Sequence, residues 1–138
     1  MYKELDEFIT ECQYMVDYWY DVGCIIAVEK LAQFNATDWE ELQSNIGTKT
    51  LEWRVKLAYC LDHSCNAHEL ETLLLLIHTD DRELFESCID TLRSFTTPES
   101  KAMILNHPSI LQRIQDILPQ AGVATQKVLE DFFKQLYV

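Results

Sequence analysis

The amino-acid sequence predicts an all-α fold, a short α-solenoid in which about eight or nine helices stack as antiparallel pairs. Apolar residues recur at helical spacing along almost the whole chain, and no segment alternates with period two for long enough to form a strand. The 138 residues include only three Gly and three Pro, too few for a chain built from many tight turns. The length and the 48% hydrophobic content suit one helical-repeat domain over residues 1–138.

In the first third of the chain, two apolar stripes and one capping motif define the helices. The first stripe consists of Leu5, Phe8, Ile9, Cys12 and Met15. The second consists of Val22, Ile25, either Val28 or Glu29, and Ala32. Asn35 is expected to end the second helix. The residues from Thr37 to Glu40 match a capping box with Thr37 at the N-cap, which predicts a short helix as far as Asn45, stopped by Gly47.

The middle of the chain predicts three further helices. Residues 50–63 are apolar on most sides, so this helix is expected in the middle of the domain. Its one polar stripe consists of Glu52, Lys56, Tyr59 and His63. A second helix ends near Thr79. The third runs from Asp80 to Phe95 and is expected to expose Arg82, Glu83, Glu86, Asp90 and Arg93.

Three shorter patterns predict the helices of the C-terminal part. Thr97 is expected at an N-cap with Pro98 at the first helical position, and Pro108 is expected to open the next helix. Pro119 and Gly122 separate that helix from the last one. The apolar face of the last helix consists of Val128, Leu129, Phe132, Phe133 and Leu136.

A faint internal repeat favours stacked helix pairs. RVKLAYCLD (54–62) and RELFESCID (82–90) share Arg, Cys, an aliphatic residue and Asp at a separation of 28 positions. AVEKLAQF (27–34) and CIDTLRSF (88–95) match at a separation of 61, about two repeats. Units of roughly 30 residues, each a helix pair, are typical of an α-solenoid. In this alignment Cys60 corresponds to Cys88, and both are expected in the core.

The stretch CLDHSCNAHEL (60–70) has two interpretations. It contains four potential zinc ligands within nine positions: Cys60, His63, Cys65 and His68. A structural zinc site usually combines two close pairs that the fold brings together, and one continuous piece would need an unusually tight turn. The structural interpretation is a helix end, a loop, and a capping box from Asn66 to Glu69. We therefore predict no metal site here.

The charge of the chain indicates which partners it can attract. The formal charge is −12, and the first 98 residues contain all of the excess, with 19 acidic against 7 basic side chains. Such a field repels nucleic acid and anionic membranes and attracts basic partners. A charge that only maintains solubility is the alternative. The five cysteines and the acidic, amphipathic start MYKELDEFIT suggest free thiols and a cytoplasmic location.

The sequence contains no motif that predicts catalysis. It has no P-loop, no dinucleotide-binding glycine motif, and no glycine-rich turn that would form an oxyanion hole. The paired carboxylates stand at the starts of predicted helices, where they interact favourably with the helix dipole. We expect a protein that is not an enzyme and takes no cofactor.

Acidic residues interspersed with aromatic ones predict a surface that binds a basic protein. Aromatic side chains serve as anchors in such surfaces, and carboxylates steer and pair with Lys or Arg. One group begins with Gln13 and Tyr14 and continues to Asp21, a second surrounds Trp39, and a third begins at Asp80. The candidate partner-binding residues are Asp17, Tyr18, Tyr20, Asp21, Asp38, Trp39, Glu40, Glu41, Asp80, Asp81, Glu83 and Glu86.

Two segments, LEWRVKLAYCLD (51–62) and LETLLLLIHTDDRELFESCIDTLRSF (70–95), resemble bacterial immunity proteins with HEAT-like helical repeats. Among them the chain looks most like the immunity protein 30 type, on helix order and the TDD…L…CID.L pattern at 79–92. The resemblance covers residues 20–96. It implies an antitoxin of polymorphic or contact-dependent growth-inhibition systems that binds one cognate toxin C-terminal domain and occludes its active site. Many of these toxins are nucleases. We expect the protein to act as a monomer in a 1:1 complex.

Two alternatives remain beside the antitoxin hypothesis. A generic helical-repeat adaptor would bind an ordinary cellular protein, and the identity of the neighbouring gene distinguishes it from an antitoxin. A metal-dependent regulator would use residues 60–68. The sequence does not identify the toxin, and it leaves open whether His63 and His68 contact the partner.

Overall fold

The computed structural model describes residues 1–12 and 16–137, and within these residues the chain is helical throughout with no strand. Nine α-helices of eight residues or more are described, so the predicted all-α class is confirmed. Gln13, Tyr14 and Met15, which the sequence assigned to the first stripe and the first aromatic group, lie outside the described residues.

The elements follow one another with short connections. They are α1 (Tyr2–Glu11), α2 (Val16–Tyr18), the π-helix η1 (Trp19–Gly23), α3 (Cys24–Leu31), α4 (Ala36–Asn45), the 3₁₀ turn η2 (Ile46–Thr48), α5 (Leu51–Tyr59), α6 (Ala67–Leu76), α7 (Arg82–Leu92), α8 (Pro98–Leu105), α9 (Pro108–Ile117), the 3₁₀ turn η3 (Leu118–Gln120) and α10 (Val123–Leu136). None of them is long and apolar enough to cross a bilayer, within the described part of the chain.

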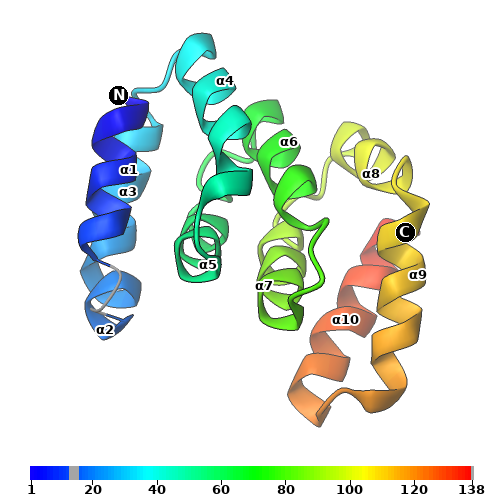
Figure 1. The fold of residues 1–138 in the computed structure, drawn as a ribbon. Helices are drawn as coiled ribbons and strands as arrows, with labels where there is room; N and C mark the ends of the chain where they lie inside the picture. The colour runs from blue at the N-terminus through cyan, green and yellow to red at the C-terminus, as the bar shows by residue number, and fades with distance from the viewer. Residues whose placement is uncertain (13–15, 138) are drawn as a thin grey trace.

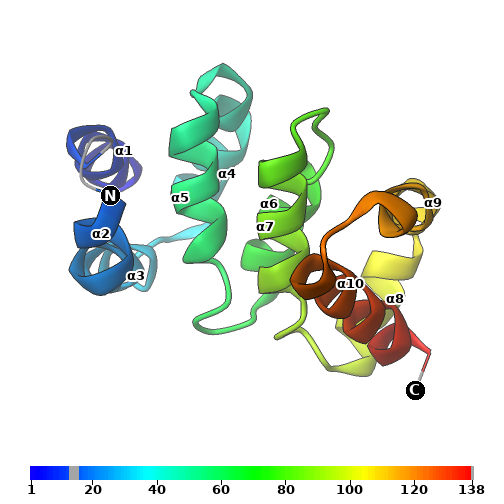
Figure 2. The same cartoon turned by 90° about the horizontal axis from the view of Figure 1, so that it is seen from below.

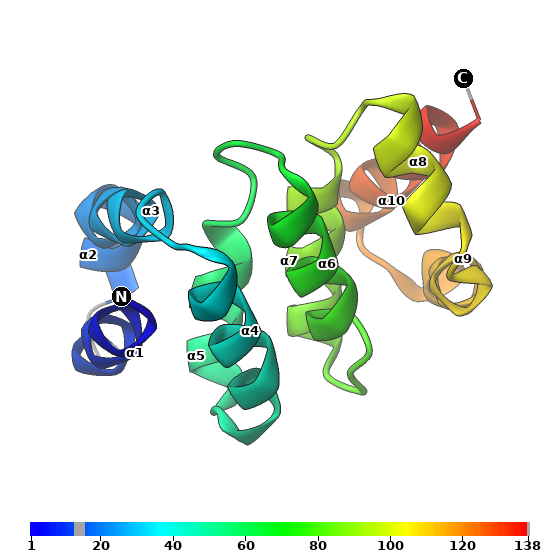
Figure 3. The same cartoon turned by 90° about the horizontal axis from the view of Figure 1, so that it is seen from above.

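The helices stack as a two-layered array (Figure 1). Helices α4, α6 and α8 form the first layer, and α5, α7 and α10 form the second; seen from above, each first-layer helix covers one of the second (Figure 3). Seen from below, α5, α7 and α10 lie side by side (Figure 2). The α1 and α3 pair packs at one end of the array, and α9 flanks the other. The predicted solenoid of stacked helix pairs is thus observed.

The N-caps of the first layer define the true period of the repeat. Helices α4, α6 and α8 begin after Asn35, Asn66 and Thr97, so successive units are 31 residues apart. Thr50 and Asp81, which cap α5 and α7, have the same separation. At each cap a side-chain oxygen accepts a backbone N–H of the first turn. The predicted N-cap at Thr97 and the capping box from Asn66 to Glu69 are confirmed.

The 28-residue register expected from the sequence is wrong by three residues. A shift of three positions is close to one helical turn, so two amphipathic helices still resemble each other after it. In the observed register Cys88 corresponds to Leu57, and Cys60 corresponds to Thr91, whose hydroxyl donates to the Ala58 carbonyl at 2.8 Å. Cys60 and Cys88 are both buried as expected, but they are not equivalent.

The start of α4 also differs from the expectation. The N-cap is Asn35, two residues before the expected Thr37, so the helix begins at Ala36. Asn35 adopts an extended conformation and forms a reciprocal capping box with Asp38. Asn35 Oδ1 accepts from the Asp38 N–H, and Asp38 Oδ2 accepts from the Asn35 N–H, both at 2.9 Å. Asn35 therefore starts a helix instead of ending one.

Helix α5 occupies the middle of the array, as its apolar composition predicted. It packs against α1, α6 and α7, and Leu57 and Ala58 have no exposed surface. Its expected polar stripe is correct for Glu52, Tyr59 and His63, which are exposed. Lys56 departs from the prediction because it is buried, which its long alkyl stem makes possible.

Gly23 is required by the packing of η1. A Cβ atom at this position would lie 2.9 Å from Trp19 Cε3, and the Trp19 side chain is fully buried. We predict that Gly23→Ala lowers the free energy of unfolding by about 1–3 kcal/mol, the usual cost of overpacking, despite the better helix propensity of Ala.

Urea denaturation measures this effect, and Gly47→Ala is the matched control. No heavy atom lies within 4 Å of a Cβ added to Gly47, so the control is expected to retain full stability. Equal stabilities of the two variants would contradict the packing described for Trp19.

Candidate functional site

The acidic group on α4 belongs to the first layer, and part of it supports the fold. The Asp38 carboxylate caps α4, accepts the Tyr2 N–H at 3.3 Å, and lies 3.4 Å from the N-terminal ammonium. The backbone hydrogen bond from Asn35 is the main cause that lowers the pKa of Asp38. Glu40 and Glu41 are exposed and face solvent.

Trp39, expected at the surface, lies in the core. Its side chain is only 4% exposed, and its ring packs edge-on against Phe34 with centroids 5.1 Å apart. The His68 ring stacks on its other side at 5.5 Å. Trp39 and Leu42 are one turn apart and both buried, so they form the apolar stripe of α4. Trp39 therefore supports the surface around it without forming part of it.

The structure brings together residues of the first and third predicted groups. Tyr20 from η1, with Asp81 and Glu83 from the start of α7, line one cleft of about 330 Å³. Asp81 also caps α7 by accepting the Leu84 N–H at 2.8 Å. The remaining wall of the cleft comes from α5 and consists of Leu51, Glu52, Val55 and Lys56.

Two tyrosines on neighbouring elements form the aromatic centre of this region. The Tyr20 and Tyr59 rings meet edge-to-face, with centroids 4.7 Å apart and an interplanar angle of 89°. The side chains remain 40% and 45% exposed. Partial burial is the main cause that raises the pKa of both phenols, and the nearby charge of Glu83 adds to the rise for Tyr20. Both phenols therefore stay protonated near neutral pH and can donate a hydrogen bond.

The surface continues from this cleft across the second layer. A second cleft, between α3, α5 and α7, is lined by Tyr59, Asp62 and Asp90, and a third, between α7 and α10, by Glu86 and Asp90. Among the described residues that line the three clefts, Lys56 is the only lysine or arginine. We define the acidic–aromatic face as Tyr20, Leu51, Glu52, Tyr59, Asp62, Asp81, Glu83, Glu86 and Asp90.

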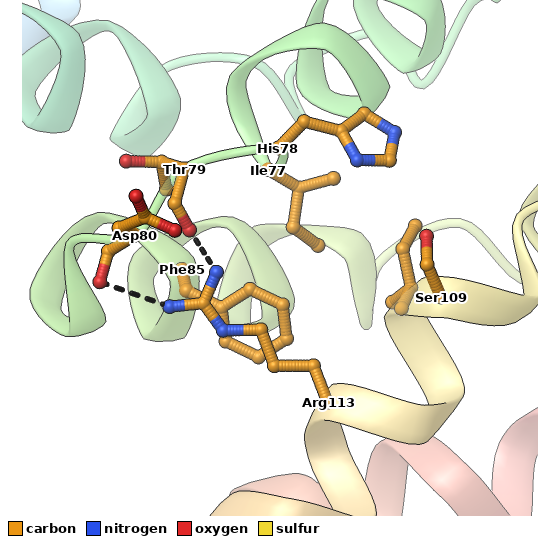
Figure 4. A pocket seen from close by; sticks show the side chains of 8 residues that line it. Ile77, His78, Thr79, Asp80, Phe85, Ser109 and Arg113 are labelled. Atoms are coloured by element: carbon orange, nitrogen blue, oxygen red, sulfur yellow. Dashed lines mark hydrogen bonds between the residues drawn. The ribbon is translucent and has the colours of Figure 1, made fainter.

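The other predicted residues lie near this face or apart from it. Asp17, Tyr18 and Asp21 are exposed on α2 and η1, beside Tyr20 in the chain. Asp80 belongs to a separate cleft of about 320 Å³ that faces α9. There the Asp80 carbonyl accepts from Arg113 Nη2 at 3.1 Å, and the Arg113 guanidinium lies 4.5 Å from the centre of the Phe85 ring (Figure 4).

Sequence reasoning omitted several members of the face. Leu51, Glu52, Tyr59, Asp62 and Asp90 were not among the predicted binding residues, although a signal for some of them was available. Glu52 and Tyr59 belong to the single polar stripe of an otherwise apolar helix. A polar stripe on a central helix marks the side that neighbouring helices leave uncovered.

The stretch CLDHSCNAHEL forms a helix end, a loop and a capping box. Cys60 is buried, and its thiol donates to the Lys56 carbonyl at 3.4 Å. Cys65 has φ 51°, and its thiol donates to the Asp62 carbonyl, also at 3.4 Å. The His68 ring stacks on Trp39. Cys60, Cys65 and His68 thus each take part in a different local contact. No group of three or more His, Cys, Asp or Glu suited to a metal occurs among the residues described.

The acidic–aromatic face has the chemistry of a protein-binding surface. Exposed tyrosines offer anchors of large contact area, and the carboxylates that line the same clefts can pair with Lys or Arg. Comparison of the chain with family models, curated proteins and solved structures finds no match. The residues of the face are therefore the basis for a functional proposal.

The edge-to-face contact of Tyr20 and Tyr59 can be measured in the free protein. In a double-mutant cycle on unfolding free energy, Tyr20→Ala and Tyr59→Ala are expected to couple by about 0.5–1.5 kcal/mol, the usual value for an aromatic pair. Tyr137, exposed near the end of α10, supplies the control, and Tyr137→Ala should be additive with Tyr20→Ala. If the coupling free energy of Tyr20 and Tyr59 is no larger than that of the control pair, the geometry of the face is contradicted.

Proposed function

We propose that the protein is an immunity protein that binds a cognate bacterial toxin domain through the acidic–aromatic face and neutralises it. The observation that carries this proposal is the convergence of exposed tyrosines and carboxylates from η1, α5 and α7 on the acidic–aromatic face. The likeness to HEAT-like immunity proteins of the immunity protein 30 type supports it, because helical arrays with an uncovered layer suit protein binding.

The charge of the face supports a basic partner, and a nuclease is the class that fits best. A nuclease needs a basic surface to hold its substrate, and a protein of charge −12 attracts such a surface. On the face itself, Glu52, Glu83 and Asp90 come from two adjacent helices. Their carboxylates can pair with Lys or Arg side chains of the partner.

The aromatic part of the face supports a tight and specific complex. Tyrosines in the centre of an interface are frequent hot spots, and surrounding polar residues exclude water from them. Tyr59 lies between the first and second clefts, with Tyr20 against its ring. Both rings are held on helices whose buried sides belong to the core, so little ordering entropy is lost on binding.

The same face would also suit an adaptor for an ordinary basic protein of the cell. An immunity gene stands directly beside the gene of its toxin, so the neighbouring gene separates the two functions. The decisive experiment expresses the toxin domain encoded upstream in bacteria, with and without this protein, and records growth.

We predict that the wild-type protein restores growth. The variants Tyr59→Ala and Glu52→Gln/Glu83→Gln should bind the toxin domain more weakly, with about 30-fold loss of affinity for Tyr59→Ala if it is a hot spot of about 2 kcal/mol. The control is Glu40→Gln/Glu41→Gln, which removes two exposed charges from the first layer. Failure of the wild-type protein to protect would refute the function, and full protection by the face variants with loss by the control would refute the face.

A further inference from the structure

A further cleft, whose charged lining residues are mainly basic, lies at the end of the second layer away from the acidic–aromatic face. It is an open cleft with a volume of about 540 Å³, lined by residues from the end of α7, the connection to α8, α8 itself and α10. Its lining residues are Arg93, Thr96, Lys101, Asp131, Lys134 and Gln135. It shares no lining residue with the three clefts of the acidic–aromatic face.

The charges of this cleft are unusual for this chain. The sequence has 23 acidic and 11 basic residues, yet the cleft collects three bases and one acid. Lys101 and Lys134 form no ion pair within the described residues, whereas Lys49, for example, pairs with Asp6 at 2.9 Å. Bringing unpaired like charges together is unfavourable unless an anion offsets their repulsion.

Helix dipoles explain only one of these lysines. Lys134 lies in the last turn of α10, where a cation is stabilised by the helix dipole. Lys101 is the fourth residue of the eight-residue α8, in its N-terminal half, where a cation gains nothing from the dipole. The position of Lys101 therefore needs another explanation.

Arg93 adds an unsatisfied donor to the same cleft. Its Nη2 donates to the Asp90 carboxylate, but its buried Nε has no hydrogen-bond acceptor. A buried guanidinium N–H without an acceptor is costly, and an oxyanion is the acceptor that a guanidinium binds best. Thr96 and Gln135 supply further neutral donors at the wall.

We propose that this cleft is a binding site for a small oxyanion with more than one charged group, either phosphate or carboxylate. Lys101 and Lys134 supply point charges from two helices, and Arg93 supplies a planar donor. The volume lies within the range of about 300–1,000 Å³ typical of ligand sites, so it exceeds the needs of a single inorganic ion. The site shares no lining residue with the acidic–aromatic face and meets it at the ion pair of Arg93 with Asp90. The proposal does not rest on the immunity function.

Titration of the purified protein with pyrophosphate and, separately, with citrate tests the proposal, by calorimetry and by amide NMR shifts at constant ionic strength. We expect 1:1 binding of at least one probe. Lys101→Gln and Lys134→Gln should each weaken it about tenfold, the effect of losing one charge-assisted hydrogen bond. Asp131→Asn should tighten it by about threefold, because a like charge is removed from the anion.

Lys127→Gln is the control, since Lys127 is exposed on α10 and does not line the cleft. Binding of pyrophosphate alone assigns the site to phosphate groups, and binding of citrate alone assigns it to carboxylates. Absence of binding by both probes overturns the proposal. An equal loss of affinity in Lys127→Gln and Lys101→Gln overturns it as well, because the attraction would then come from the overall charge and not from the cleft. Weaker binding by Asp131→Asn also overturns it, because the anion would then not lie near Asp131.

Discussion

The packing of α5 against α7 is the interaction on which the rest of the structure depends. Each helix pair has an apolar side that it cannot bury alone, so neighbouring pairs must stack. Leu57 on α5 and Ile89 on α7 are fully buried in one hydrophobic cluster that extends through the array. The buried hydrogen bond from Thr91 to the Ala58 carbonyl joins the same two helices. Because this buried hydrogen bond needs Thr91 opposite Ala58, it favours the observed register of α7 on α5 over registers shifted by one helical turn.

This stacking also determines the surface chemistry. Because α5 and α7 lie side by side with their inner faces buried, their outer stripes form one surface that no other described helix covers. Glu52 and Glu83 thereby line one cleft, and Tyr59 and Asp90 line the next. Farther along the same layer, α7 ends near α8 and α10, and the surface changes sign around Lys101. One array thus presents two regions of opposite charge.

The sequence predicts the local features of this fold well and its long-range features poorly. Helices, the N-cap at Thr97 and the middle position of α5 follow from periodicity and capping chemistry, which act over a few residues. The register was misjudged because amphipathic helices match themselves after one turn, and only the caps at Asn35 and Asn66 reveal the period. Trp39 stands among acids in sequence, but its helix turns it inward. The contact between Tyr20 and Tyr59 depends on tertiary packing that no local pattern contains.

NMR mapping of the toxin domain's footprint on the isotope-labelled protein tests the central claim most directly. If the acidic–aromatic face is the binding surface, the largest amide shift changes on adding the unlabelled domain will occur at Tyr20, Glu52, Tyr59 and Glu83. The account is contradicted if the largest changes occur instead at Glu40, Glu71 and Leu75, which are exposed on α4 and α6 of the first layer.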